Sequence, residues 1–380
     1  MFARMLRELR YLASHRWDLA MVTLVPLLLL IMLASMFYQG KAEHLPIAFV
    51  DQDHSQLSHE IEHRLSLNTT VDVVLKTTDL TEVERQINQT KIWGYVYVPE
   101  GAEQRLVHAD DAGIAIAYNL SYFSVGNSIS SAMSLSTLQA IAAYMGEDYL
   151  AQHIPDINIP TAHVKISPLY NPGLNYEFYL QPLMVPAILH LLLCCCVAFS
   201  IGHHYLNSKH SLAAPTTLAT TFKELNAKIL VYVLIFCLWT WAWMYWMVVI
   251  RGWFIAGQLW IILVAQFVFY YAYAYISACI VLATRNLSKS FGVIAVYGGS
   301  SLSFAGVTLP VNNAVAFTQI WADLIPYTPY AKLQTQQWAM ASPLMSSLPQ
   351  LGIIALFLCI FALLCALLIA KSLKHKELVT

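Results

Sequence analysis

Hydrophobic and polar positions follow different periods along the chain, and the change of period divides it into segments. Long, almost uncharged apolar stretches recur, each close to the roughly 20 residues that a helix needs to cross a bilayer. We predict six such helices, at residues 17–39, 178–202, 229–250, 258–284, 290–309 and 348–370. An even number of crossings places both termini on the same side of the membrane.

Residues 40–177 lack long apolar runs and show a shorter period. Runs rich in β-branched and aromatic residues predict strands, and stretches with apolar residues at helical spacing lie between them. The strands are predicted at 46–50, 71–75, 93–98 and 114–118, and the helices at 55–67, 79–88 and 124–144. Strands that alternate with helices predict an α/β domain, and the segment is long enough for a core of its own.

Four shorter segments complete the division. Residues 1–16 have apolar positions at helical spacing with arginines on other faces, which predicts an amphipathic helix in the membrane interface. These positions are Phe2, Met5, Leu6, Leu9 and Leu12. Residues 203–228 form a polar loop, and residues 371–380 form a basic tail. Residues 310–347 are apolar but interrupted by prolines, which predicts short re-entrant helices.

The composition supports a membrane protein. Of the 380 residues, 58% are hydrophobic and 11% are charged, and the mean hydropathy is +0.56. Soluble globular chains are about 45–50% apolar and about 25% charged, so this chain falls among integral membrane proteins. The formal net charge of −1 gives no reason to expect binding to nucleic acid.

The distribution of charge orients the chain, because Lys and Arg prefer the cytoplasmic ends of membrane helices. The segments that six spans would place on one side carry Arg4, Arg7, Arg10, Arg16, Lys209, Lys223, Lys228, Arg285, Lys289, Lys371, Lys374 and Lys376. Segment 40–177 is instead rich in Asp and Glu. We therefore predict an α-helical polytopic membrane protein with six transmembrane helices, cytoplasmic termini, and a large extracytoplasmic α/β domain between helices 1 and 2.

One short motif indicates metal chemistry. The stretch LSHEIEHRL contains His-Glu-x-x-His, in which His59 and His63 would share a helix face as zinc ligands and Glu60 would act as the general base. The apolar stripe of the same helix lies on the opposite side, which predicts a solvated face for the histidines. No motif for a third ligand accompanies them. A membrane-anchored zinc metalloprotease is therefore an alternative, and no metal site is predicted.

The energy for any transport is expected to come from a partner. The sequence contains no Gly-x-x-x-x-Gly-Lys-Ser/Thr motif, with which a P-loop would hold ATP. The predicted spans also hold few ionisable residues, which ion-coupled pumps need as relays. All seven cysteines lie in predicted spans, so no disulfide framework is expected in residues 40–177.

Aromatic residues are frequent in the predicted spans. The stretch FYYAYAY places Tyr271, Tyr273 and Tyr275 close together, and the preceding span contains Trp239, Trp241, Trp243 and Trp246. These side chains could line a surface for an amphiphilic substrate, but aromatic belts at the membrane interfaces are the more ordinary interpretation.

A series of motifs, in order, resembles the membrane subunit of an ABC-2-type exporter. RELRYL precedes a first span that contains Pro26, and IAFVDQDHSQLS opens the outer domain. YNPGLNYEFYLQPLMVPAIL introduces the second span, FKELNAKIL leads into the third, and FAGVTLPV and ADLIPYTPY follow the fifth. The resemblance covers nearly the whole chain. It departs at HHYLNSKHSL and at Ala227, where the family often has an Arg/Glu-rich stretch and a glycine.

The resemblance implies a half-transporter in the bacterial inner (cytoplasmic) membrane that exports an amphiphilic, lipid-linked or drug-like substrate. It implies a cytoplasmic ABC ATPase that binds ATP and Mg²⁺, and a second permease that is identical or a paralogue. It also allows a periplasmic adaptor. This chain would bind no cofactor itself and would contact membrane lipid. A coupling helix in segment 203–228 would contact the ATPase through Leu212, Pro215, Leu218, Phe222, Lys223 and Glu224.

The resemblance further implies an outer gate. Gly306 and Pro310 would shape the gate, and Pro326 and Pro329 would set a re-entrant hairpin. No catalytic residue is implied, so the chain is not expected to be an enzyme. Besides the zinc protease, a non-transporting assembly or sensor protein stays open as an alternative.

Overall fold

The computed structural model describes the chain except for residues 39, 41–42, 109, 120–122, 146–169, 172–174, 207–216, 308–310, 312–313 and 378–380. The chain forms two compact units. We call Gln39–Leu174 the α/β unit, and Met1–Tyr38 together with Asn175–Thr380 the helical unit. The sequence prediction places the corresponding boundaries at residues 40 and 177.

The α/β unit is built on a four-stranded sheet. Its strands are β1 (Leu45–Asp51), β2 (Val71–Thr77), β3 (Gly94–Val98) and β4 (Ala115–Tyr118). They are ordered β2-β1-β3-β4, with β1 parallel to β2 and β3, and with β4 antiparallel to β3. All four strands overlap the segments predicted from the sequence. The apolar run in the middle of β1 is buried on both faces, because helices cover the sheet on each side.

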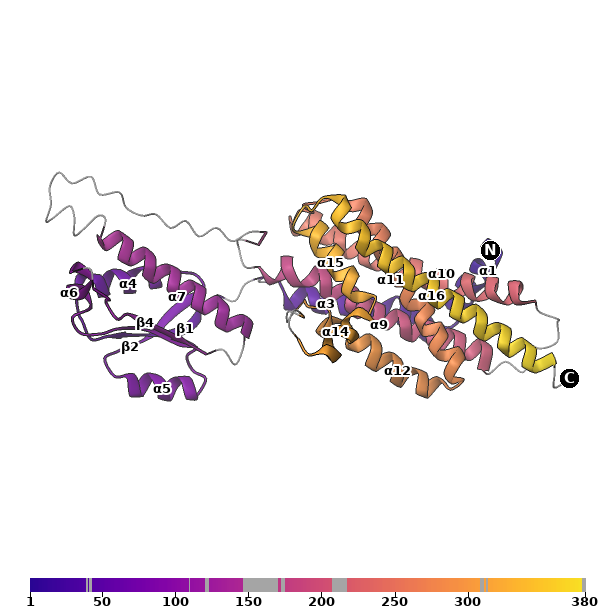
Figure 1. Cartoon of the computed structure of the whole chain (residues 1–380), viewed down its shortest axis with the longest axis horizontal. Helices are drawn as coiled ribbons and strands as arrows, with labels where there is room; N and C mark the ends of the chain where they lie inside the picture. Colours follow the sequence, from indigo (N-terminus) through magenta and orange to yellow (C-terminus); the bar gives the residue numbers. More distant parts are fainter. Residues whose placement is uncertain are drawn as a thin grey trace. The chain divides into compact units, whose positions relative to one another are not determined.

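Helices α4 (Gln56–Ser66) and α7 (Phe123–Ala143) cover one face of this sheet, and α5 (Leu80–Asn88) covers the other (Figure 1). The short α6 (Ala102–Val107), which the sequence pattern does not predict, follows β3. Ile47 and Phe49 of β1 join the core beneath α4 and α7, whereas Ala48 and Val50 join the core beneath α5. Alternate residues of one strand therefore serve two cores.

The described residues of the helical unit form α1 (Phe2–Ser14), α2 (Arg16–Val22), α3 (Leu24–Met36), α9 (Tyr176–Leu206), α10 (Leu218–Tyr245), α11 (Leu259–Thr284), α12 (Leu287–Gly299), α13 (Ser301–Phe304), α14 (Ala316–Asp323), α15 (Tyr327–Trp338) and α16 (Leu344–Glu377). A π-helical turn, Trp246–Ile250, continues α10. Helix α11 is central, because it packs against α9, α10, α12, α15 and α16. Figure 1 shows α1 and the last turns of α16 at the same end of the unit.

Within the described residues, five helical stretches are long and apolar enough to cross a membrane. They are Arg16–Met36, Tyr176–His203, Leu218–Ile250, Leu259–Thr284 and Leu344–Lys374. The predicted span 290–309 is divided instead into α12 and α13, with the break at Ser300 after two glycines. Glycine is a poor helix former, which accounts for a break at this point. The sixth crossing therefore stays a prediction.

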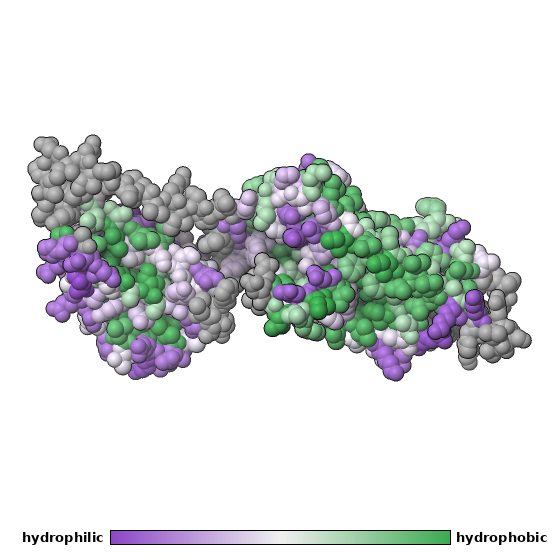
Figure 2. Space-filling model, viewed as in Figure 1, coloured by the Kyte–Doolittle hydropathy of each residue, from purple (hydrophilic) through white to green (hydrophobic). Residues whose placement is uncertain are grey.

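The face of the helical unit that Figure 2 shows is largely hydrophobic. Helix α3 exposes Leu28 and Ile31, and α16 exposes Leu356, Leu363 and Leu367. Soluble monomers rarely expose apolar patches of this extent. Helices whose backbone groups are bonded internally can present such side chains to acyl chains, so this surface fits a lipid environment.

Candidate functional site

Helix α1 is joined to two long helices through one buried carboxylate. Glu8 is only 5% exposed although its side chain is ionisable. It accepts hydrogen bonds from Lys228 Nζ at 2.7 Å, from Ser200 Oγ at 2.9 Å and from the Tyr232 hydroxyl at 3.4 Å. Ser200 lies on α9, and the other two donors lie on α10. We call these four residues the inner junction.

The position of Glu8 in the sequence indicates that its side chain is buried, because it lies among the apolar residues of α1. Glu8 lies three residues after Met5 and four before Leu12, so it shares the apolar stripe of α1 with them. Leu12 is buried on the same side. A carboxylate on the buried stripe of an amphipathic helix needs a hydrogen-bonding partner. The sequence does not say which residue is the hydrogen-bonding partner of Glu8.

The inner junction lies near both ends of the segment predicted to contain the coupling helix. Helix α9 ends at Leu206, about two turns after Ser200, and α10 begins at Leu218, about three turns before Lys228. The Thr217 hydroxyl caps the start of α10 by accepting a hydrogen bond from the Thr220 N–H. The two helices that flank residues 207–216 therefore share one carboxylate.

Two of the predicted ATPase-contact residues are exposed at the start of α10. Leu218 is 41% exposed, and Lys223 is also exposed. Leu212 and Pro215 lie outside the described residues. Leu218 and Lys223 therefore form the described part of a surface at which a partner protein could bind.

Two other predicted contact residues are engaged within the chain itself. Phe222 is half-buried, and its ring stacks on Tyr275 of α11 with centroids 6.2 Å apart. Glu224 Oε1 lies 3.8 Å from Arg4 Nε of α1. Both side chains thus contact other helices of the same chain, and their contact with an ATPase stays a prediction.

A second buried carboxylate lies at the start of α9. Glu177 is fully buried and accepts hydrogen bonds from Arg251 at 2.8 and 2.9 Å and from Trp253 Nε1 at 2.8 Å. Arg251 also donates to the carbonyl oxygen of Tyr38, beyond the end of α3, at 2.7 Å. The hydrogen bonds and the negative charge of Glu177 raise the pKa of Arg251 although burial opposes this. We call these four residues the outer junction.

The predicted gate residues lie in the turns around α13 and α15. Gly306 has a φ of +75°, a left-handed conformation that glycine adopts without strain. Pro326 precedes α15 and Pro329 lies in its first turn, where the missing N–H of proline has no helical partner to lose. Both prolines are buried. Pro310 lies outside the described residues, and the gate itself stays a prediction.

The short helices predicted for residues 310–347 are present as α14 and α15, with opposite surroundings. Helix α15 is buried against α9, α11 and α16, and its Tyr327 hydroxyl donates to the Leu183 carbonyl oxygen at 2.8 Å. Helix α14 instead exposes Phe317 and Ile320. The entry of this pair into a membrane stays a prediction.

The interpretation of FYYAYAY as an interfacial belt is wrong for Tyr273 and Tyr275, which are buried, whereas Tyr271 is half-buried. Tyr273 is fully buried, and its hydroxyl lies 2.8 Å from Ser301 Oγ. Tyr275 is also buried and donates to Asn226 Oδ1 at 2.9 Å, and Tyr271 donates to the same oxygen. Because α11 is the central helix, the phenol groups find partners on neighbouring helices instead of reaching the membrane surface.

The His-Glu-x-x-His motif lies on an exposed face of α4. His59 and His63 are both exposed, and Glu60 accepts a 2.6 Å hydrogen bond from Arg64 one turn later. Among the residues that the structure describes, no group of three or more His, Cys, Asp and Glu side chains could hold a metal ion. The candidate general base is ion-paired within its own helix, so the geometry gives no support to a zinc protease.

Comparison with known proteins identifies the family. A family model described as ABC-2 family transporter protein matches residues 16–371, which include the outer junction and the two helices of the inner junction. No curated protein and no solved structure matches the chain. The extent of the family match and the five apolar helices agree on a multi-pass membrane protein of the permease type. The chain belongs to the ABC-2 transporter family.

Proposed function

We propose that this chain is the permease subunit of an ATP-driven exporter in the bacterial inner membrane, with both termini in the cytoplasm. A separate cytoplasmic ATPase would bind ATP and Mg²⁺, and a second permease, identical or a paralogue, would complete the path. The exported substrate would be amphiphilic, lipid-linked or drug-like. Support comes from the family match, since ABC-2 permeases in general work with a partner ATPase.

The inner junction is the observation that carries this proposal. Glu8 holds Ser200 of α9 and Lys228 of α10 through charge-assisted hydrogen bonds of 2.9 and 2.7 Å. A push on segment 207–216 would therefore move α9 and α10 together, with α1 attached to both. Rigid-body movement of packed helices is one of the ordinary ways in which a local event reaches a distant site.

The outer junction supplies the second fixed point. Glu177 and Arg251 join the start of α9 to the turn that follows α10, and Arg251 continues the contact to Tyr38 after α3. Helices α9 and α10 are thus connected by buried polar contacts near both of their ends. We infer that they transmit movement as one body between the ATPase and the opposite side of the membrane.

The proposal is tested by a substitution of Leu218, an exposed leucine at the start of α10. Leu218→Asp should abolish substrate-stimulated ATP hydrolysis by the copurifying ATPase and should abolish export, because it places a charge on the proposed contact surface. Membrane insertion should be unchanged. Leu67→Asp, which alters an exposed leucine of the α/β unit, is the matched control and should leave both activities intact.

Two results would contradict the proposal. Export and ATPase stimulation that survive Leu218→Asp would show that this surface does not couple the two proteins. An ATPase whose turnover never changes in the presence of the permease would favour the non-transporting sensor instead.

A further inference from the structure

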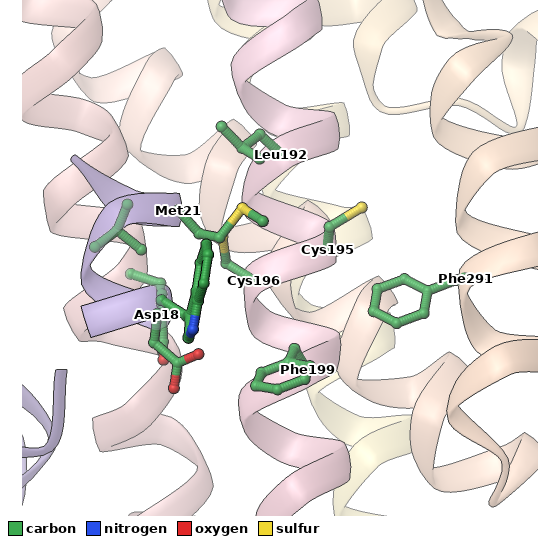
Figure 3. A pocket seen from close by; sticks show the side chains of 10 residues that line it. Asp18, Met21, Leu192, Cys195, Cys196, Phe199 and Phe291 are labelled. Carbon is green, nitrogen blue, oxygen red and sulfur yellow. The ribbon is translucent and has the colours of Figure 1, made fainter. Parts of the chain in front are cut away.

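A cavity of about 430 Å³ lies against α9, between α2 and α12. In Figure 3, Asp18 and Met21 approach α9 from one side and Phe291 from the other. Its volume lies in the range of roughly 300–1,000 Å³ that is usual for sites of small molecules. All the helices that line it belong to the helical unit.

The cavity is partly open to the surroundings of the helical unit. Two of its aromatic lining residues are exposed, since Trp17 is 73% exposed and Phe199 is 41% exposed. Tyr232, which also lines the cavity, is buried. A ligand that enters here would therefore come from the lipid and would need an apolar part to occupy most of the space.

Asp18 supplies the one carboxylate of the lining. In the described part of the chain it forms no ion pair with a lysine or arginine, and Arg16 lies instead over the Trp17 ring, 5.9 Å from its centroid. Burial raises the pKa of the neighbouring Tyr11, and the negative charge of Asp18 raises it further. Tyr11 is hydrogen-bonded to Asp18, and Lys228 Nζ lies 5.9 Å from the centroid of the same Tyr11 ring. Asp18 is thus a cavity-lining carboxylate with a phenol as its hydrogen-bonding partner.

We propose that this cavity binds an amphiphile with a cationic head group, such as a quaternary ammonium or another organic cation. The head would lie beside Asp18, where a lowered dielectric strengthens charge attraction. The faces of Trp17, Phe199 and Phe291 would favour a cation in the same space, because aromatic rings attract cations through their quadrupoles. The inference rests on the proposed function and names the substrate class for it.

The native Cys195 in the cavity wall provides the test. The permease with its ATPase, in uncharged maltoside micelles, is treated with N-ethylmaleimide, and labelling of each cysteine is followed by mass spectrometry. Dodecyltrimethylammonium should protect Cys195 from labelling, whereas dodecanol and dodecanoate should protect it much less. Cys359, exposed on α16, should be labelled equally in every sample.

Substitutions separate the charge from the shape of the cavity. Asp18→Asn should raise the half-protecting concentration of dodecyltrimethylammonium roughly tenfold, the effect of losing one charge-assisted contact. Asp18→Glu should retain protection, which distinguishes lost charge from lost folding. Asp323→Asn, which changes an exposed acid at the end of α14, should have no effect.

Equal protection by dodecanol and by the cation would overturn the proposal in favour of an ordinary lipid. A Cys195 that is unreactive without any amphiphile, and becomes reactive only when two permeases are dissociated, would overturn it in favour of a subunit interface. Neither result bears on coupling to the ATPase. Loss of that coupling, with the Asp18-dependent protection intact, would contradict the proposed function alone.

Discussion

Lys228 of α10 donates a 2.7 Å hydrogen bond to Glu8 of α1, and both side chains are largely shielded from solvent. Removal of one partner from a buried ion pair leaves an uncompensated charge, which destabilises proteins by about 3–5 kcal/mol. Glu8→Ala should therefore lower the free energy of unfolding by about 3 kcal/mol, measured by denaturation in mixed micelles.

The pair Arg4 and Glu224 is the control for this prediction. Its atoms lie 3.8 Å apart on a more exposed surface, where ion pairs contribute about 1 kcal/mol or less. A double-mutant cycle should give a large interaction energy for Glu8 with Lys228 and a small one for Arg4 with Glu224. Equal values for the two pairs would contradict the structural role of the inner junction.

The outer junction predicts that arginine and lysine are not equivalent at position 251. Arg251 contacts both oxygens of Glu177 and the Tyr38 carbonyl oxygen, which a lysine ammonium cannot reach in the same geometry. Arg251→Lys should lower the free energy of unfolding by about 2 kcal/mol. Arg85→Lys, at an exposed pair with Glu82 in the α/β unit, should be nearly neutral. A neutral Arg251→Lys would show that the bidentate contact is not needed.

Asp53 predicts an acid-dependent loss of stability in the α/β unit. Its carboxylate accepts hydrogen bonds from the N–H groups of Gly101, Ala102 and Glu103 at the start of α6. Burial raises the pKa of Asp53, whereas hydrogen bonds from Ser55 and from these N–H groups lower it. The hydrogen bonds together outweigh burial, so the net shift of the pKa is downward. The carboxylate thus stabilises the fold above its ordinary pKa of about 3.9, and this contribution disappears as pH falls through the lowered value.

Asp53→Asn should remove this dependence. The variant should lose about 1 kcal/mol above pH ~4 and should show a shallower loss of stability with acid, measured by hydrogen exchange in α6. Asp72→Asn, at an exposed position of β2, should change stability by less than about 0.5 kcal/mol. A steep acid limb that persists in Asp53→Asn would assign the effect to another carboxylate.

We expect that oxidation can cross-link Cys279 of α11 to Cys365 of α16 within the helical unit. Their Sγ atoms lie 2.9 Å apart, and both side chains are buried. Two equivalents of a lipid-soluble one-electron oxidant, copper(II) phenanthroline, should each accept one electron and become copper(I), while the two thiols lose two protons and form a disulfide. Mass spectrometry should find this linkage in Cys359→Ser and should not find it in Cys365→Ser. Oxidation without a link between α11 and α16 would contradict the observed packing.

Local patterns predicted the strands because each depends on a short run of residues. The run of residues 46–50 predicted a strand, and the structure contains β1 at this place, with its middle residues buried. The break at Ser300 was not predicted, because Gly298 and Gly299 lie inside an otherwise uncharged apolar run and composition alone does not mark a helix break.

The contacts of the junctions could not be predicted in the same way. Glu8 and Lys228 are far apart in the sequence, and the residues around each of them do not identify the other as its partner. The same limit applies to Tyr273, whose partner Ser301 lies on another helix. The sequence shows that such polar groups need hydrogen-bonding partners in an apolar bundle. Tertiary packing determines which residues become those partners.

The separation of 220 residues between Glu8 and Lys228 has a consequence for biogenesis. Synthesis proceeds from the N-terminus, so the carboxylate leaves the ribosome long before its ammonium partner exists. Until α10 is made, Glu8 lacks the ammonium group that accounts for its shortest hydrogen bond. A nascent chain halted ahead of Lys228 would therefore hold its N-terminal helix less firmly than the complete chain does.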